Sequence, residues 1–384
     1  MKGKGVVLKK VIFCIVLLTL LQITRDVYAG EIGDEEIEID FSEWEEAVSE
    51  SGILDEDIDI EEIFSLLLQG KTKEVGKILK DGVKNILFGE IGKQKEILMS
   101  LFFLLLIAGI FRTLTQSFQN GLTSQTGFYV TYLLVFSLSF SSFYTSCQVV
   151  LEVLEQMIGF MKVAIPVYCL FVTLSSGQEV GSGMYELLFL VLFGLEWLIK
   201  NIIFPSIKIY VVFSMLKELS EELKLERLCE LLKNSIQWIL KAVTVFVLGL
   251  STVQNMILPT VDGAKYLAIQ KSIKALPAGE AALAAGNFLT GSSVVIKNSI
   301  GITAMILLLL LLLIPFVKIG TMLVGFMGLG AIMEPVCQKG LIQVLESVAS
   351  GGVLLWKMIS TVVVIFLVSI CIISFATNMR LYGI

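Results

Sequence analysis

Long apolar runs constrain this chain more than any other feature. Several of them approach or exceed the roughly 17–20 residues that a helix needs to cross the hydrocarbon core of a bilayer. Only 17% of the 384 residues are charged, against about 25% in a typical soluble domain. We therefore predict an all-α, polytopic integral membrane protein. The expected spans are residues 98–114, 128–144, 158–174, 184–199, 202–216, 236–258, 299–317 and 353–375.

The number of crossings is expected to lie between six and nine. The two spans that meet at Asn201 also fit a single kinked hairpin. Residues 321–336 are rich in glycine and contain Pro335, so they fit either a further span or a re-entrant segment. Irregular backbone at membrane depth requires protein or a water-filled cavity around it.

The first 29 residues have the order of a secretory signal peptide. A basic segment with four lysines precedes an apolar stretch at residues 11–21. Val27, Tyr28 and Ala29 then form an acceptable cleavage site before Gly30. We predict cleavage between Ala29 and Gly30, and the alternative is an uncleaved first transmembrane helix.

The next segment, residues 30–97, changes the sign of its charge along its length. Residues 31–62 hold sixteen Asp or Glu and no Lys or Arg. This composition favours a solvated segment, with an amphipathic docking strip as the alternative. Residues 63–97 place lysines on the polar side of a helical pattern. We expect an amphipathic extramembrane region whose basic part rests on the membrane surface.

Two polar stretches interrupt the membrane part. Residues 217–233 alternate charges with leucines at helical spacing, which predicts a surface helix within a first bundle, residues 98–258. Residues 259–298 are rich in small residues and predict a loop before the C-terminal membrane helices, residues 299–384. Small residues permit close backbone approach, so this loop is a candidate packing or partner-docking element. The residues expected to act there are Gly286, Gly291, Ser292, Ser293, Lys297 and Asn298.

The composition argues against an enzyme or a metalloprotein. The chain contains no histidine, which removes His-based acid–base catalysis, the Ser-His-Asp triad and the usual zinc sites. Its six cysteines show no paired spacing. Residues 286–293 have the two-glycine spacing of a phosphate-binding loop but lack the lysine that contacts the phosphates. We expect no catalytic residue, no cofactor, no metal site and no nucleic-acid partner.

One charged pair inside an apolar run is a candidate site. Glu196 and Lys200 are four residues apart, so on a helix they share a face and can form an ion pair. Ionisable residues within spans are costly and often functional. Three interpretations remain open: Lys200 extends to the interface, the two residues form a structural pair, or they line a transport pathway. Glu334, beside Pro335 in a glycine-rich apolar segment, is a further candidate.

The C-terminal third resembles a known family. Residues 286–301 read GNFLTGSSVVIKNSIG and run into the apolar segment TAMILLLLLLLIPFVKIG at residues 303–320. MEPVCQKGLIQVLESVASGG follows at residues 333–352 and leads into the last span. With the signal segment and the many spans, this pattern resembles the stage III sporulation protein AE family of endospore-forming bacteria over most of the chain.

The resemblance implies a role in sporulation. Members of that family belong to a set of eight proteins that is made in the mother cell and builds a secretion-like channel, or feeding tube, to the engulfed forespore. The set includes a cytoplasmic ATPase and small membrane partners, and the implied location is the mother-cell membrane that surrounds the forespore. The rival hypothesis is a stand-alone small-solute permease in which Glu196, Lys200 and Glu334 line a pathway. The chain shows no internal repeat, which weakens that rival.

Overall fold

The computed structural model describes residues 42, 60–69, 71, 74–75, 96, 98–110, 121–217, 225–274 and 279–379. The expected signal segment, its cleavage site at Ala29 and Gly30, and most of the acidic segment lie outside these residues.

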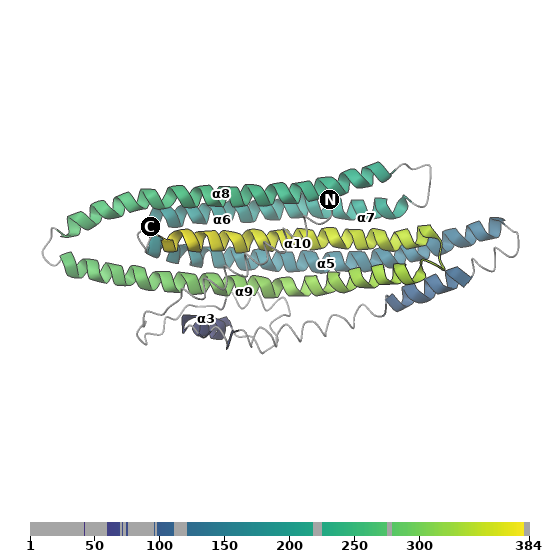
Figure 1. Ribbon diagram of the computed structural model, residues 1–384, viewed down its shortest axis with the longest axis horizontal. Helices are drawn as coiled ribbons and strands as arrows, with labels where there is room; N and C mark the ends of the chain where they lie inside the picture. The colour runs from purple at the N-terminus through teal and green to yellow at the C-terminus, as the bar shows by residue number, and fades with distance from the viewer. Residues whose placement is uncertain are drawn as a thin grey trace.

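All regular secondary structure in the described residues is helical, which confirms the predicted all-α class. The long helices lie side by side along one axis and form an elongated bundle (Figure 1). Two shorter helices, α3 (Ile60–Leu68) and helix 98–110 (Leu98–Ile110), contact α9. The elements of the bundle are α5 (Gly121–Ser176), α6 (Gln178–Leu198), the π-helix η1 (Ile199–Ile203), α7 (Phe204–Leu216), α8 (Glu226–Lys274), α9 (Gly279–Met333) and α10 (Lys339–Met379).

The bundle helices are longer than the predicted spans because pairs of spans merge. The expected spans 128–144 and 158–174 belong to the single helix α5, and 184–199 and 202–216 form one continuous unit through η1. Five helices of the described chain are long and apolar enough to cross a membrane, and Leu98–Ile110 is a shorter apolar helix, so the eight expected spans are merged into fewer helices. At about 1.5 Å per residue, the 56 residues of α5 extend about 84 Å, more than twice the roughly 30 Å of a hydrocarbon core.

The polar interruptions are also helical. The expected loop at 259–298 is wrong, because α8 continues to Lys274 and α9 begins at Gly279. Alanine is the strongest helix former, and this alanine-rich segment follows that propensity despite its glycines. Within the expected surface helix at 217–233, residues 226–233 form the first two turns of α8 and expose Glu226, Arg227 and Glu230.

A single glycine reverses the chain between α5 and α6. Gly177 has φ 109° and ψ 162°, a region of backbone space that is essentially restricted to glycine. It is the only positive-φ glycine of the described residues. Its N–H donates to Thr173 O (2.9 Å) and its carbonyl accepts from Gly181 N–H (3.0 Å). These bonds join the end of one helix directly to the start of the next.

Replacing Gly177 with alanine should destabilise the bundle by about 1–3 kcal/mol, because the new side chain strains this conformation. Thermal unfolding in detergent, followed by circular dichroism, measures the effect. Gly159→Ala is the matched control, since Gly159 lies inside α5 with open space around it. The control should be neutral or stabilising, and an equal loss in both variants would contradict the assignment.

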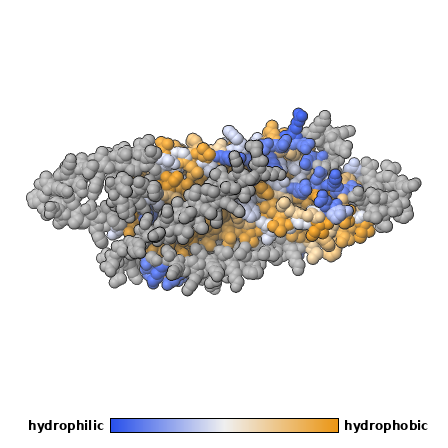
Figure 2. Space-filling view, viewed as in Figure 1, coloured by the Kyte–Doolittle hydropathy of each residue, from blue (hydrophilic) through white to orange (hydrophobic). Residues whose placement is uncertain are grey.

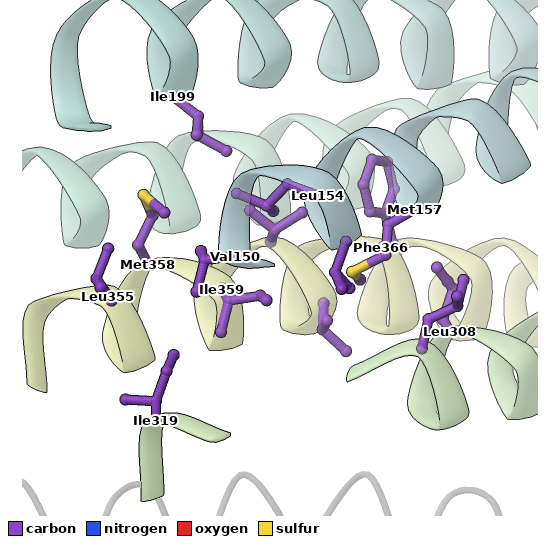
Figure 3. Close-up of a cluster of buried hydrophobic side chains, with 14 of the residues drawn as sticks. Val150, Leu154, Met157, Ile199, Leu308, Ile319, Leu355, Met358, Ile359 and Phe366 are labelled. Atoms are coloured by element: carbon purple, nitrogen blue, oxygen red, sulfur yellow. The ribbon is translucent and has the colours of Figure 1, made fainter. Parts of the chain in front are cut away.

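The hydrophobic core lies where α10 packs against its neighbouring helices. Side chains of α5, α9 and α10 interdigitate, and Ile199 of η1 approaches from the other side (Figure 3). The buried residues labelled in the close-up are Val150, Leu154, Met157, Ile199, Leu308, Ile319, Leu355, Met358, Ile359 and Phe366.

Small residues let α10 approach three helices at one level. A methyl group on Gly351 would lie within 2.9 Å of Phe143 Cε2 of α5 and closer still to Val211 of α7. A methyl group on Gly352 would lie within 2.6 Å of Met322 Cε of α9. Close helix contact at small residues is typical of membrane bundles. The glycine pair therefore fixes the centre of the bundle.

Hydroxyl groups join the same helices. Ser214 of α7 donates to Ser347 Oγ of α10 (2.9 Å), and Tyr168 of α5 shares a hydrogen bond with Ser374 of α10 (3.0 Å). Interhelical hydrogen bonds of this kind contribute modestly to membrane bundles, about 0.6 kcal/mol on average. Their main effect here is to fix the register of α10 against α5 and α7.

Candidate functional site

The structure brings Glu196 and Lys200 together within a cluster of four charged residues. Lys200 Nζ lies 3.2 Å from Glu196 Oε1 on its own helical unit and 3.0 Å from Glu155 Oε1 of α5. Lys162 Nζ of α5 lies 3.1 Å from Glu196 Oε2. Two acids and two bases thus alternate across the α5–α6 contact, and the charges compensate one another.

The backbone beneath the cluster is irregular. Phe204 N–H donates to Ile199 O, five residues earlier, as a π-helix requires. Asn201 Nδ2 donates to Trp197 O at 2.9 Å, so the side chain supplies a donor to that carbonyl. Pro205 follows in the first turn of α7 and has no N–H to give. Single π-turns inside helices often occur at functional sites, and this one carries Lys200.

The cluster lies on the outside of the bundle. The side chain of Glu196 is 22% exposed and that of Glu155 is 52% exposed. Lys162 Nζ also lies 5.7 Å from the ring centroid of Phe193, a residue that is itself exposed. These positions suit an ion network at the bundle surface better than the wall of an internal pathway.

Sequence spacing alone missed Glu155 and Lys162 as partners. They are seven residues apart on α5, so they share a face of that helix. The face becomes relevant only because the turn at Gly177 folds α6 back along α5. The sequence signal that could have identified these partners is the spacing of the charges on both helices, taken together with the position of the turn.

The ion pairs are expected to contribute modest stability. In a double-mutant cycle, Glu196→Gln and Lys200→Gln should show a coupling of about 0.2–1 kcal/mol, the range measured for partly exposed pairs. Thermal unfolding in detergent measures each variant. Glu186→Gln with Lys200→Gln provides the control, because Glu186 is exposed and lies outside the cluster. Coupling of the same size in the control would show that Lys200 has no specific partner.

The second group of candidates lies in the interior of α9. Ser293, Lys297 and Asn298 are buried, and Lys297 is 0% exposed. Asn298 Oδ1 and Ser299 Oγ are buried without a hydrogen-bond partner. The segment expected to be a packing or partner-docking loop is therefore helical and packed over these residues. Gly286 and Gly291 belong to the same helix, and their surroundings lie outside the described part of the structure.

Glu334 does not join the cluster. It is exposed in the turn that connects α9 to α10. Met322 of α9 is level with Ser146 of α5. Glu334 lies twelve residues beyond Met322, and Glu155 lies nine residues beyond Ser146 in the opposite direction, so the two carboxylates are about 30 Å apart along the bundle axis. The three residues of the permease hypothesis thus do not meet in one place.

Within the described residues, the other candidate chemistry is sparse. No group of three or more His, Cys, Asp or Glu residues there is placed to hold a metal ion. The described cysteines are free thiols: Cys147, Cys169, Cys229, Cys337 and Cys371.

Comparison with known proteins identifies relatives of this chain. The model of the Stage III sporulation protein AE family matches residues 58–377. The chain is 24% identical over 301 residues to Stage III sporulation protein AE of Bacillus subtilis (strain 168), covering 77% of this chain and 74% of that protein. No solved structure matches the chain.

Proposed function

Because the chain belongs to the stage III sporulation protein AE family, we propose that it is the multi-pass membrane subunit of a secretion-like channel between mother cell and forespore. It acts without catalysis of its own, in the mother-cell membrane that surrounds the forespore. Its partners are other stage III sporulation membrane proteins and the cytoplasmic ATPase that supplies energy.

The observation that carries this proposal is the length of the exposed apolar surface. Ser146 of α5 donates to Met322 Sδ of α9 at 3.2 Å, which sets these residues at one level. The exposed Leu174 lies 28 residues beyond Ser146, and the exposed Met327 lies five residues beyond Met322 in the opposite direction. These side chains are therefore about 50 Å apart along the axis.

One bilayer does not cover that surface. A hydrocarbon core is only about 30 Å thick, so part of the exposed apolar surface lies outside it. Large exposed apolar patches mark contacts with other proteins or membranes. Partner subunits of a multiprotein channel supply that cover, whereas a permease that works alone does not.

The rival permease has less support. Glu196 and Lys200 form ion pairs at the surface of the bundle. Glu334 lies far from them in the turn after α9. A transport pathway needs ionisable groups that face a shared cavity, and this arrangement does not provide one.

Co-purification from sporulating cells tests the proposal. The tagged chain is extracted in mild detergent, and the proteins that accompany it are identified. We expect other stage III sporulation proteins and the ATPase to be recovered, and fewer of them with Val324→Ser/Met327→Ser, which removes exposed apolar side chains of α9. Recovery of the chain alone, with solute flux through liposomes that contain only this chain, would favour the permease.

A further inference from the structure

Every tryptophan in the described part of the chain lies beside a lysine. Trp197 precedes Lys200, and Trp238 precedes Lys241, by three residues in each case. Trp356 is followed directly by Lys357. Trp197 and Trp238 are exposed and Trp356 is half-buried. Tryptophan and lysine are the residues that anchor membrane helices at the head-group layer, the first by its amphipathic ring and the second by its long charged side chain.

Contacts between side chains place three of these helices at one level. Lys200 of η1 meets Glu155 of α5 at 3.0 Å. Residues that touch between α5 and α10 differ in number by 206 at Tyr168–Ser374 and by 208 at Phe143–Gly351. These offsets set Lys357 beside residues 149–151 of α5, which is about 6–9 Å along the axis from Glu155.

The remaining two helices share that level. The ring of Phe316 on α9 lies 4.4 Å, centroid to centroid, from the ring of Trp356 on α10, so Lys318 of α9 is level with Lys357. The end of α7 and the start of α8 lie at the same end of the bundle (Figure 1). Lys241 lies fifteen residues from the start of α8 and Lys200 sixteen residues from the end of α7, so they are about 22 and 24 Å from that end.

On one side of this level α8, α9 and α10 are free of charge for one bilayer thickness, whereas α5 carries Lys162 and α6 carries the exposed Glu186 there. Residues 242–261 of α8, 298–317 of α9 and 358–379 of α10 contain no Asp, Glu, Lys or Arg. They comprise twenty, twenty and twenty-two residues, which span about 30–33 Å, the thickness of a hydrocarbon core. All three extend from their lysine toward the α5–α6 turn.

On the opposite side the bundle has a polar face. The first turns of α8 expose Glu226, Arg227 and Glu230, and α10 exposes Glu346. Figure 2 shows hydrophilic side chains gathered toward this end of the bundle, above a hydrophobic area. Charged groups on a lipid-facing surface are costly. The half that contains these residues exposes more charged side chains than the other half, where Glu186 of α6 is exposed, so it is less suited to enclosure by lipid.

We propose that Trp197, Trp238 and Trp356, with Lys200, Lys241, Lys318 and Lys357, form an interfacial belt that binds the head-group layer of a phospholipid bilayer. The hydrocarbon core encloses the half of the bundle that ends at the α5–α6 turn, and the half that contains helix 98–110 projects from the membrane. Glu155 and Lys200 of the ion cluster then lie at the head-group level, where charge is tolerated, and their partners Glu196 and Lys162 lie about 6 and 10 Å deeper along their helices. This assignment stands independently of the sporulation role.

Depth-dependent fluorescence quenching tests the belt. Single-tryptophan variants are prepared by replacing the other tryptophans, Trp44 included, with phenylalanine. The purified full chain is reconstituted into phosphatidylethanolamine–phosphatidylglycerol vesicles whose lipids carry bromine either near the head group or near the acyl-chain end. Val253→Trp and Leu133→Trp in the tryptophan-free chain are the controls, because both positions are exposed, 53% and 57% respectively. Val253 lies twelve residues beyond Lys241 on α8, about 18 Å and so near the middle of the hydrocarbon core.

The three belt tryptophans should lose more fluorescence to shallow bromines than to deep ones. Val253→Trp should lose more to deep bromines, and Leu133→Trp should lose little to either. Stronger deep than shallow quenching of the belt tryptophans, or deep quenching of Leu133→Trp equal to that of Val253→Trp, overturns the proposal.

Nitroxide labels provide a second measurement that keeps all tryptophans in place. Leu133→Cys and Val253→Cys are spin-labelled in the otherwise native chain, whose described cysteines are mostly buried. Label at position 133 should collide mainly with a water-soluble nickel chelate, and label at position 253 with oxygen dissolved in the lipid. The same lipid accessibility at both positions contradicts the placement even if the tryptophan-free chain fails to fold.

Discussion

Replacing Gly351 with leucine is expected to prevent stable folding of the bundle. Even the first carbon of the new side chain would lie within 2.9 Å of Phe143 Cε2 and would collide with Val211. Both neighbours are buried ring or branched side chains, so neither has room to move. Overpacking of a core costs about 1–3 kcal/mol and occasionally more, and this position lies at the upper end because two helices are displaced together.

The measurement is the amount of folded protein in membranes, with thermal unfolding in detergent for the fraction that is recovered. Gly249→Leu is the control, since Gly249 of α8 has nothing within 4 Å of the added carbon. It should accumulate at the wild-type level. Normal accumulation and unfolding of Gly351→Leu would mean that α10 does not approach α5 and α7 as described.

Replacing Lys297 with alanine is expected to destabilise the bundle by about 2–5 kcal/mol, the range for truncating a large buried side chain. Lys297 is 0% exposed, and its removal opens a cavity in α9 next to the buried Asn298. Lys297→Met keeps most of the side-chain volume and should destabilise the bundle less than Lys297→Ala does. The matched control is Lys318→Ala on the same helix, because Lys318 is only partly buried.

Thermal unfolding of the three variants, with helical content from circular dichroism, decides the outcome. The predicted order of stability is Lys318→Ala above Lys297→Met, and Lys297→Met above Lys297→Ala. If Lys297→Ala were as stable as Lys318→Ala, the side chain would extend to an interface, as expected for a lysine at the mouth of a span.

The helical membrane class was predictable because it depends on composition. Apolar length and low charge act through the bilayer itself, and they do not depend on which helices touch. The ends of the helices were less predictable. The expected span 128–144 ends just before Thr145 and Ser146, but both side chains donate to carbonyls four residues earlier, at Ser141 and Ser142. These bonds let polar residues continue the helix, so α5 does not end there.

The candidate sites were also only partly predictable from the sequence. The pair of Glu196 and Lys200 was predictable from a spacing of four residues, since both belong to one helical unit. Their partners on α5 depend on the turn at Gly177 and on the register that follows from it. The burial of Lys297 was not predictable, because it depends on how α9 packs against its neighbours. The small-residue-rich segment 259–298 was interpreted as a loop, although its alanines favour a helix.

Site-specific photo-crosslinking in sporulating cells shows whether partner subunits cover the projecting half of the bundle. A photoreactive amino acid replaces the exposed Met327 in the projecting half of α9 or, as the control, the exposed Leu170 in the half assigned to the bilayer. We expect protein adducts with other stage III sporulation proteins at Met327 and few or none at Leu170. Adducts absent at Met327 in cells that form spores normally would contradict the claim that partner subunits cover this surface.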